Sequence, residues 1–348
     1  MSPYVLMILL SSLGLGTTLT FASSHWLLAW MGLEINTLAI IPLMAQHHHP
    51  RAVEATTKYF LTQATAAAMI LFASTTNAWI SGEWDMNNMS SPIASAMVMT
   101  ALALKIGLAP MHFWMPEVLQ GLDLLTGLIL STWQKLAPLA LIMQTAQTMD
   151  PLLLTSLGLM STLVGGWGGL NQTQLRKILA YSSIAHMGWM IIILQYAPQL
   201  TLLALGTYIF MTSAAFLTLK TSSATKINTL AMTWSNSPVL TTTTALVLLS
   251  LGGLPPLTGF MPKWLILEEL TKQNLPIIAT VMALAALLSL YFYLRLCYAM
   301  TLTISPNTIN SVTPWRVQTA QTSLPLTIST TMALGLLPMT PAILMLAT

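Results

Sequence analysis

The chain alternates from one end to the other between long apolar segments and short breaks rich in proline, glycine or polar residues. A helix that crosses a bilayer needs about 20 mostly apolar residues, and about eleven segments of this sequence approach or exceed that length. They cover approximately residues 3–22, 25–44, 59–80, 92–110, 123–146, 150–170, 176–196, 199–221, 238–270, 275–300 and 324–346. The pattern therefore predicts an all-α, polytopic membrane protein.

The ninth segment, 238–270, is too long for one straight span and contains several helix breakers. Part of it repeats an earlier part of the chain, because residues 253–263 (GLPPLTGFMPK) align without a gap with residues 107–117 (GLAPMHFWMPE). The offset of 146 residues, 253 minus 107, also carries the first predicted helix onto the sixth, the second onto the seventh, the third onto the eighth and the fifth onto the tenth.

Two repeats of five helices follow from this offset, at residues 1–148 and 149–302, with a loop and a last helix at 303–348. An odd number of helices makes the second repeat enter the membrane from the opposite side, which is the inverted-repeat architecture of many transporters. Broken helices at corresponding positions, here the fourth and the ninth, mark the ion path in such folds. Kinks at proline and glycine also occur without a function, but the same motif at the same position in both repeats favours an ion path.

The composition agrees with a membrane protein and excludes several other classes. Of 348 residues, 55% are hydrophobic and only 6% are charged, whereas soluble domains carry about 25% charged residues. A single cysteine, Cys297, excludes a disulfide framework and a cysteine-rich metal or iron–sulfur site. With 12 basic and 9 acidic residues, the charge is too sparse for a surface that binds nucleic acid.

The basic residues are distributed unevenly between the two sides of the predicted membrane. Loops after even-numbered helices hold Arg51, Lys58, Arg176, Lys177, Lys220, Lys226 and Arg316. Loops after odd-numbered helices hold Lys272 together with Glu83, Asp85, Asp150, Glu268 and Glu269. By the positive-inside rule, the N-terminus lies on the positive side, the matrix or the cytoplasm, and the C-terminus lies opposite.

The loops and the N-terminus narrow the possible functions further. No loop exceeds about 25 residues, which leaves no room for a nucleotide, flavin or iron–sulfur domain, so any redox chemistry belongs to another subunit. Residues 1–21 lack the basic start of a secretory signal and the Arg-rich pattern of a transit peptide. We interpret them as the first membrane helix.

Four ionisable residues fall inside predicted membrane helices or at their breaks: Glu34, Lys105, Lys135 and Lys263. An ionisable residue at the bilayer centre costs about 2.5–3.5 kcal/mol on insertion scales, so each of these residues is expected to have a function. A lysine side chain reaches the interface only from near a helix end. Lys135 has about ten residues on either side, or ~15 Å, and is too deep for that.

Histidines are weaker candidates for a proton path. His112 in the first break and His186 in the seventh predicted helix can relay protons near neutral pH, but a structural hydrogen bond explains each of them equally well. The adjacent residues His47, His48 and His49 resemble a metal-binding tract. Beside Pro50 in a short loop they are more typical of surface composition, and we expect no metal site.

The four buried charges predict a mechanism of proton transfer. Desolvation favours the neutral form of a lysine, while a nearby carboxylate favours its charged form. If Glu34 faces Lys105, then moving or neutralising Glu34 lets Lys105 release its proton to Lys135 through water, and Lys263 serves as the gate to the opposite face. Moving one proton against 100 mV costs about 2.3 kcal/mol, and the driving energy has to come from a partner.

Five motifs in order resemble a known family. They are residues 31–36 (MGLEIN), 105–114 (KIGLAPMHFW), 133–138 (WQKLAP), 179–188 (LAYSSIAHMG) and 254–264 (LPPLTGFMPKW). Together they resemble the antiporter-like membrane subunits of respiratory complex I, NADH–ubiquinone oxidoreductase, in their mitochondrially encoded animal form. The resemblance runs essentially from end to end of the chain.

The resemblance implies a proton-translocating subunit of the inner mitochondrial membrane, with its N-terminus on the matrix side. It pairs Glu34 with Lys105, makes Lys135 the central relay and assigns Lys263 to the terminal channel. It also implies that this chain binds no cofactor, since NADH, FMN, iron–sulfur clusters and ubiquinone belong to other subunits. The implied partners are those subunits, above all neighbouring antiporter-like ones, and lipids such as cardiolipin.

Two other classes of function remain compatible with the same residues. A stand-alone cation/proton antiporter would share the fold and the buried charges but would exchange ions without a redox partner. A structural spacer in a membrane complex would carry the charges without using them. Redox-driven pumping after Lys135→Met or Glu34→Gln distinguishes the spacer from the pumping subunit.

Overall fold

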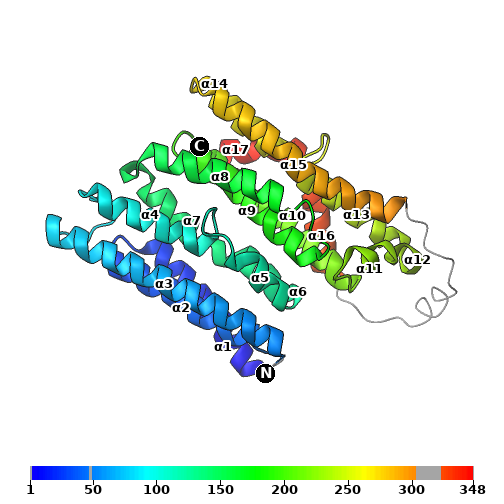
Figure 1. The fold of residues 1–348 in the computed structure, drawn as a ribbon, viewed down its shortest axis with the longest axis horizontal. Helices are drawn as coiled ribbons and strands as arrows, with labels where there is room; N and C mark the ends of the chain where they lie inside the picture. The colour runs from blue at the N-terminus through cyan, green and yellow to red at the C-terminus, as the bar shows by residue number, and fades with distance from the viewer. Residues whose placement is uncertain (1, 47–48, 303–322, 348) are drawn as a thin grey trace. The chain divides into compact units, whose positions relative to one another are not determined.

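The computed structural model describes residues 2–46, 49–302 and 323–347, and these ranges are almost entirely helical (Figure 1). The chain forms two compact units, Met1–Ser161 and Thr162–Thr348. Each unit is described by itself. The prediction of an all-α membrane protein is confirmed for the described part of the chain.

The first unit begins with three long helices that lie side by side, α1 (Pro3–Ala22), α2 (Trp26–Met44) and α3 (Pro50–Ser81) (Figure 1). Glycines allow α1 and α2 to approach closely, because a Cβ atom on Gly32 would lie 2.9 Å from the carbonyl oxygen of Gly16. Such contacts between small residues are a common way for membrane helices to pack.

The helix α3 begins nine residues before the predicted position 59. Its first turns carry Arg51, Glu54 and Lys58, which are compatible with a helix but not with an apolar span. Hydropathy therefore marked the apolar part of this helix and not its start. Pro50 occupies the first turn, where its missing N–H costs no hydrogen bond.

The predicted break in the fourth helix is confirmed. The helix α4 (Pro92–Ile106) ends at Gly107, whose φ of 84° is left-handed, and a cis Ala109–Pro110 bond follows. A second short helix, α5 (Trp114–Gly121), lies beyond the predicted end at residue 110. The sequence prediction missed α5 because eight residues that include Pro116 show too little periodicity.

The remaining helices of the first unit are α6 (Leu124–Ser131), α7 (Trp133–Thr145), a 3₁₀ turn η1 (Ala146–Thr148) and the beginning of α8 (Pro151–Gly168). The single helix predicted over 123–146 is interrupted at Thr132. The Thr132 hydroxyl donates a hydrogen bond of 2.7 Å to the carbonyl of Leu128, and a side chain bonded in this way bends a helix.

Besides the rest of α8, the described part of the second unit contains nine α-helices and one 3₁₀ turn. They are α9 (Leu175–Ile193), α10 (Pro198–Thr221), α11 (Ile227–Ala231), α12 (Thr233–Asn236), α13 (Pro238–Gly252), α14 (Phe260–Lys272), α15 (Pro276–Thr301), and the C-terminal α16 (Leu324–Gly335), 3₁₀ turn η3 (Leu337–Met339) and α17 (Thr340–Ala347). The short helices α11 and α12 were not predicted. The last predicted helix, 324–346, is bent by 67° between α16 and α17.

The ninth predicted helix is broken in the same way as the fourth. The helix α13 ends at Gly253 with a φ of 80°, a cis Pro255–Pro256 bond follows, and α14 begins at Phe260. The 146-residue offset relates the first residues of α4 and α13, the two left-handed glycines, and the first residues of α5 and α14. The repeat seen in the sequence is therefore also a repeat of local structure.

Six helices in the described ranges are individually long and apolar enough to cross a membrane: α1, α2, the α6–α7 segment Leu124–Thr148, α8, α10 and α15. The bent pair of α16 and α17 makes a possible seventh, while α4 and α13 are shorter apolar helices. All eleven predicted segments contain a helix within the described residues, although not every one of these helices passes this test alone.

Candidate functional site

Two of the predicted lysines lie at one cavity of the first unit. Lys105 belongs to the last turn of α4 and is 6% exposed, and Lys135 belongs to the first turn of α7 and is 2% exposed. Both line the same small cavity. Its other polar or partly polar lining residues are Asn36, Thr37, Tyr59, Gln63, Trp114 and Gln134.

The break between α4 and α5 positions Lys105. Because Gly107 ends α4, Lys105 stands beside carbonyl groups that have no partner within the helix. The carbonyl of Leu104 accepts a hydrogen bond of 3.2 Å from the backbone N–H of Gly107 and one of 3.0 Å from Nε1 of Trp114, the first residue of α5. The chain thus folds back over the end of α4 and encloses the lysine.

Lys135 is positioned by the interruption between α6 and α7. Its backbone N–H donates to the carbonyl of Thr132 at 3.3 Å. The neighbouring Gln134 donates through Nε2 to the backbone carbonyl of Asn36 at 3.2 Å and so connects α7 with α2. This contact fixes the start of α7 against the wall of the cavity.

Glu34 lies half-buried on α2, next to the cavity residue Leu33. Its carboxylate interacts electrostatically with Lys105 and with Tyr59. Within the described part of the chain, no group donates a hydrogen bond to Glu34 Oε2 and none accepts one from Lys105 Nζ, although both atoms are buried. The structure thus brings Glu34, Lys105 and Lys135 to one region of the first unit.

Lys263 belongs to the second unit and has a different environment. It lies half-buried in the first turn of α14, and its Nζ donates a hydrogen bond of 2.8 Å to the carbonyl of Gly252 at the end of α13. A cation at a helix C-terminus is favourable because the helix dipole is negative there. A Cβ atom on Gly253 would lie 2.9 Å from Lys263 Nζ, so glycine leaves room for the lysine.

The two histidine candidates have local structural contacts. His112 is buried in the break after α4, with Nδ1 3.2 Å from the carbonyl of Pro110. His186 is half-buried on α9, and its ring centroid lies 5.6 Å from that of Tyr208. Each geometry is compatible with a structural role and with a proton relay.

The sequence prediction missed three residues that belong in a description of the buried polar groups. Tyr59 and Gln63 of α3 line the cavity, but a tyrosine and an uncharged amide in an apolar helix give no clear signal. Arg295 of α15 donates a hydrogen bond of 2.6 Å through Nη1 to the carbonyl of Leu170, just after α8. A charged residue inside the predicted apolar helix 275–300 was the signal in the sequence that could have identified Arg295.

Among residues 2–46, 49–302 and 323–347, no group of three or more His, Cys, Asp and Glu side chains is arranged to hold a metal ion. Of the histidine tract, His47 and His48 lie outside the described residues, as does Arg316. His49 accepts a hydrogen bond from the backbone N–H of Arg51 at the start of α3. For this histidine the structure shows a helix cap.

Comparisons with known proteins show that the chain matches two family models. A family model described as NADH:quinone oxidoreductase/Mrp antiporter, TM, matches residues 23–289, and one described as NADH dehydrogenase subunit 2 C-terminus matches residues 290–344. The chain is 85% identical to NADH-ubiquinone oxidoreductase chain 2 of Carassius auratus and 80% identical to that of Danio rerio, with 100% of both chains covered in each case.

Two solved structures resemble the chain over nearly its whole length. A chain of respiratory complex I from Thermus thermophilus with bound Aureothin is 28% identical, with a TM-score of 0.86 over 99% of this chain and 80% of that chain. A chain of the Mrp complex from Dietzia sp. has a TM-score of 0.84 at 15% identity, over 97% of this chain and 76% of that chain. At this lower identity the similarity shows a common fold.

Proposed function

The chain belongs to the NADH:quinone oxidoreductase/Mrp antiporter family of membrane proteins, and we propose that it translocates protons as a membrane-arm subunit of respiratory complex I. Electrons pass from NADH to ubiquinone in other subunits of that enzyme, where NADH, FMN, iron–sulfur clusters and ubiquinone bind. This chain couples the energy of that reaction to proton movement across the inner mitochondrial membrane.

One observation carries this proposal: two lysines, Lys105 and Lys135, are buried at the same cavity, which is lined in part by α2 and by the α6–α7 segment, both long enough to cross a membrane. Burying an ionisable group in this environment is costly, and two of the same sign are harder still to keep charged together. The pair is therefore suited to sharing a proton, with one lysine charged while the other is neutral.

Glu34 provides the control over this proton. Its carboxylate attracts the ammonium group of Lys105, so Lys105 holds its proton while that attraction is present. When a change in the neighbouring subunit moves or neutralises Glu34, Lys105 releases the proton toward Lys135. Each proton moved against 100 mV requires about 2.3 kcal/mol, which the redox reaction supplies.

The remaining predicted residues complete the path in this proposal. Lys263 controls transfer in the second unit, where the end of α13 attracts its ammonium group. His112 and His186 serve as additional relays. The N-terminus faces the matrix and the C-terminus the intermembrane side, neighbouring antiporter-like subunits and lipids such as cardiolipin contact the exposed helices, and the chain itself binds no cofactor.

The test replaces Lys135 in the assembled oxidoreductase reconstituted into vesicles. Lys135→Met removes the proton carrier, and Lys135→Arg keeps a positive charge that cannot be released. We expect both variants to lower NADH–ubiquinone turnover coupled to pumping by at least about tenfold, since a positioned proton-transfer group contributes about 10²–10⁴-fold. Lys220→Met, at an exposed lysine at the end of α10, is the control.

Native electrophoresis of each variant establishes that the complex has assembled. Intact assembly with lost pumping supports the proposal, and Glu34→Gln is expected to give the same result. If the assembled Lys135 variants pump at the normal rate, the chain is a spacer and the proposal is wrong. Ion exchange by the purified chain alone in liposomes, without a redox partner, would contradict the proposal in favour of a stand-alone antiporter.

A further inference from the structure

Gln63 is a buried polar residue that the proton path described above does not include. It lies on α3, one helical turn after Tyr59, and only 3% of it is exposed. Both residues line the cavity that also holds Lys105 and Lys135. A glutamine at such a position in a membrane helix requires a reason, because a leucine would fill the same space without a polar group.

Two buried hydrogen-bond donors at the cavity have no acceptor among the described residues. Among the described residues, none accepts a hydrogen bond from Gln63 Nε2 or from Lys105 Nζ, and both atoms are fully buried. Buried polar groups almost always have a partner, which is ordered water when no protein group is available. Two donors beside one cavity therefore require an acceptor inside it, and water fits that requirement.

Asn36 shows a similar deficit but points to a different place. Both polar atoms of its side chain are buried without a partner among the described residues. However, a Cβ atom added to Gly16 of α1 would lie only 2.5 Å from Asn36 Oδ1, so the amide is turned toward α1. Gln63 is thus the stronger candidate for binding a group inside the cavity.

We propose that Gln63 is a positioning residue that holds a water molecule beside Lys105, and that this water carries the proton from Lys105 toward Lys135. The proposal rests on the proposed function of the chain. The water accepts hydrogen bonds from Gln63 Nε2 and from the Lys105 ammonium group and directs its own O–H toward Lys135. Without the amide, the water loses the contact that fixes its orientation.

The transfer step is balanced. An N–H bond of Lys105 breaks as a new O–H bond forms on the water, and one of the original O–H bonds of the water breaks as an N–H bond forms on Lys135. Lys105 becomes neutral, Lys135 becomes charged and the water is regenerated. The Gln63 amide takes no proton at any point.

The test compares Gln63→Leu with Thr56→Val in the assembled oxidoreductase. Thr56 is buried on the same face of α3, but its hydroxyl donates to the carbonyl of Val53 within the helix, which makes it a matched control. We expect Gln63→Leu to slow pumping-coupled turnover about tenfold, equivalent to about 1.4 kcal/mol in the barrier. Thr56→Val should leave it unchanged, and Gln63→Asn should restore part of the rate.

Infrared difference spectra recorded during turnover in H₂¹⁸O and H₂¹⁶O provide a readout that a packing role would not change. An isotope-sensitive water band that is present in the natural enzyme and in Thr56→Val, but absent in Gln63→Leu, supports the proposal. Normal turnover and an unchanged water band in Gln63→Leu would overturn it. If the Lys135 variants have lost pumping while Gln63→Leu has not, this inference fails and the proposed function stands.

Discussion

Among the described residues, buried and half-buried cations such as Lys105, Lys263 and Arg295 occur in two kinds of environment. Lys263 and Arg295 donate to carbonyls at or just beyond helix ends, those of Gly252 and Leu170, where a fixed partial negative charge stabilises them. Lys105 has no acceptor for its Nζ among the described residues and interacts with the carboxylate of Glu34. The partial negative charge at a helix C-terminus is permanent, whereas the charge of a carboxylate is removed by protonation or displaced when the side chain moves. This difference favours Lys105 as the controlled group.

A prediction at the same scale concerns the exposed ion pairs at the start of α3. Lys58 Nζ lies 2.8 Å from Glu54 and 2.7 Å from Glu117 of α5. The hydrogen bond from Lys58 lowers the pKa of Glu54 from its ordinary value of 4.5, and the carboxylates of Glu117 and Glu54 raise the pKa of Lys58. The stabilisation is present above the ordinary carboxyl pKa and is lost as pH falls through the lowered value.

The measurement is the difference in Tm between the natural complex and a Lys58→Met variant, recorded from pH 7 downward at low and high salt. We expect a small difference at pH 7 that shrinks as the carboxyl groups become protonated, and that also shrinks with salt because exposed pairs are screened. A difference that is independent of both pH and salt would mean that Lys58 stabilises the fold through packing.

At the scale of the elements, the two helix breaks determine where Lys105 and Lys263 lie. Each break consists of a helix that ends at a left-handed glycine, a cis proline bond and a second helix that begins seven residues after that glycine. In the first unit the break encloses Lys105, and in the second it places Lys263 at the end of α13. The same backbone thus presents a different lysine in each unit.

The first break leads to a prediction for Gly107. An alanine there would have to adopt a φ of 84°, which costs about 1–2 kcal/mol for a residue with a Cβ atom, and its Cβ would lie 3.3 Å from the sulfur of Met115. We expect Gly107→Ala to lower the Tm of the complex. Gly14 lies within α1, and a Cβ atom added there would have no neighbour within 4 Å. Gly14→Ala should therefore leave the Tm unchanged or raise it. Equal Tm values for the two variants would refute this explanation.

At the scale of the whole molecule, the repeats share their backbone pattern but not their charges. The 146-residue offset places Ala180 where the first unit has Glu34, Leu251 where it has Lys105, and Val281 where it has Lys135. Lys263 corresponds to Glu117. The cluster of one carboxylate and two lysines therefore belongs to the first unit alone, and the second unit keeps the architecture with a single lysine at its break.

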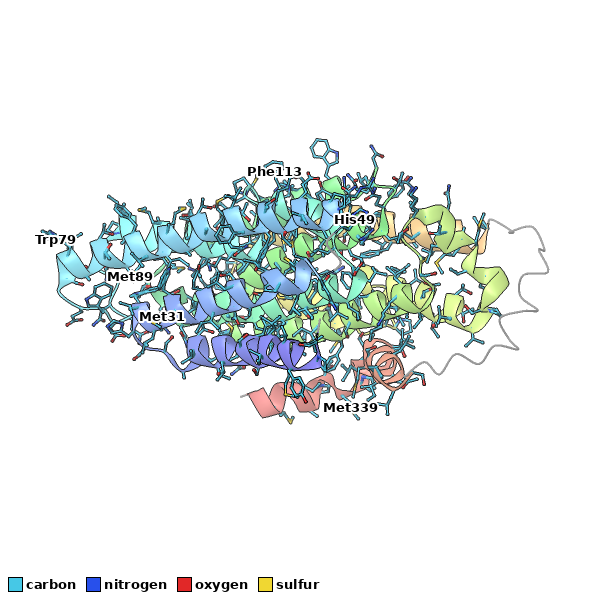
Figure 2. All side chains as sticks on the ribbon, turned by 90° about the horizontal axis from the view of Figure 1, so that it is seen from below. Met31, His49, Trp79, Met89, Phe113 and Met339 are labelled. Carbon is cyan, nitrogen blue, oxygen red and sulfur yellow. The ribbon has the colours of Figure 1, made fainter. Side chains whose placement is uncertain are left out.

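Orientation in the membrane is the prediction that belongs to this scale. His49 and Trp79 mark opposite ends of α3 (Figure 2), a helix of 32 residues, or about 48 Å, which exceeds the ~30 Å apolar core of a bilayer. Arg51 and Glu83 are exposed near these ends. We expect a membrane-impermeant thiol reagent to label Arg51→Cys only from the matrix side and Glu83→Cys only from the opposite side.

Cys297 is buried, so the natural chain provides the unlabelled background for this experiment. Labelling of both variants after solubilisation in detergent shows that neither site is permanently covered by a neighbouring subunit. Labelling of Arg51→Cys from the intermembrane side would reverse the orientation derived from the distribution of lysine and arginine, and with it the direction of the proposed path.

The sequence by itself determined the class, a helix in each of the eleven predicted segments, both breaks and the lysines associated with them. It could do so because the bilayer imposes a minimum length on each apolar segment and a large free-energy cost on each buried charge. The length of an apolar segment and the position of a charged residue within it can both be read from the sequence. Local backbone constraints at Gly107 and Gly253 are equally visible in sequence, because left-handed positions favour glycine.

Only the tertiary structure decided which of these residues meet. Glu34, Lys105 and Lys135 come from three helices, and their common surroundings depend on how α2, α4 and α7 pack around one cavity. The early start of α3, the short helix α5 and the place of Gln63 are likewise consequences of packing. An uncharged amide in an apolar helix has no distinctive pattern in the sequence, and only the tertiary structure shows that Gln63 Nε2 is buried without a hydrogen-bond partner among the described residues.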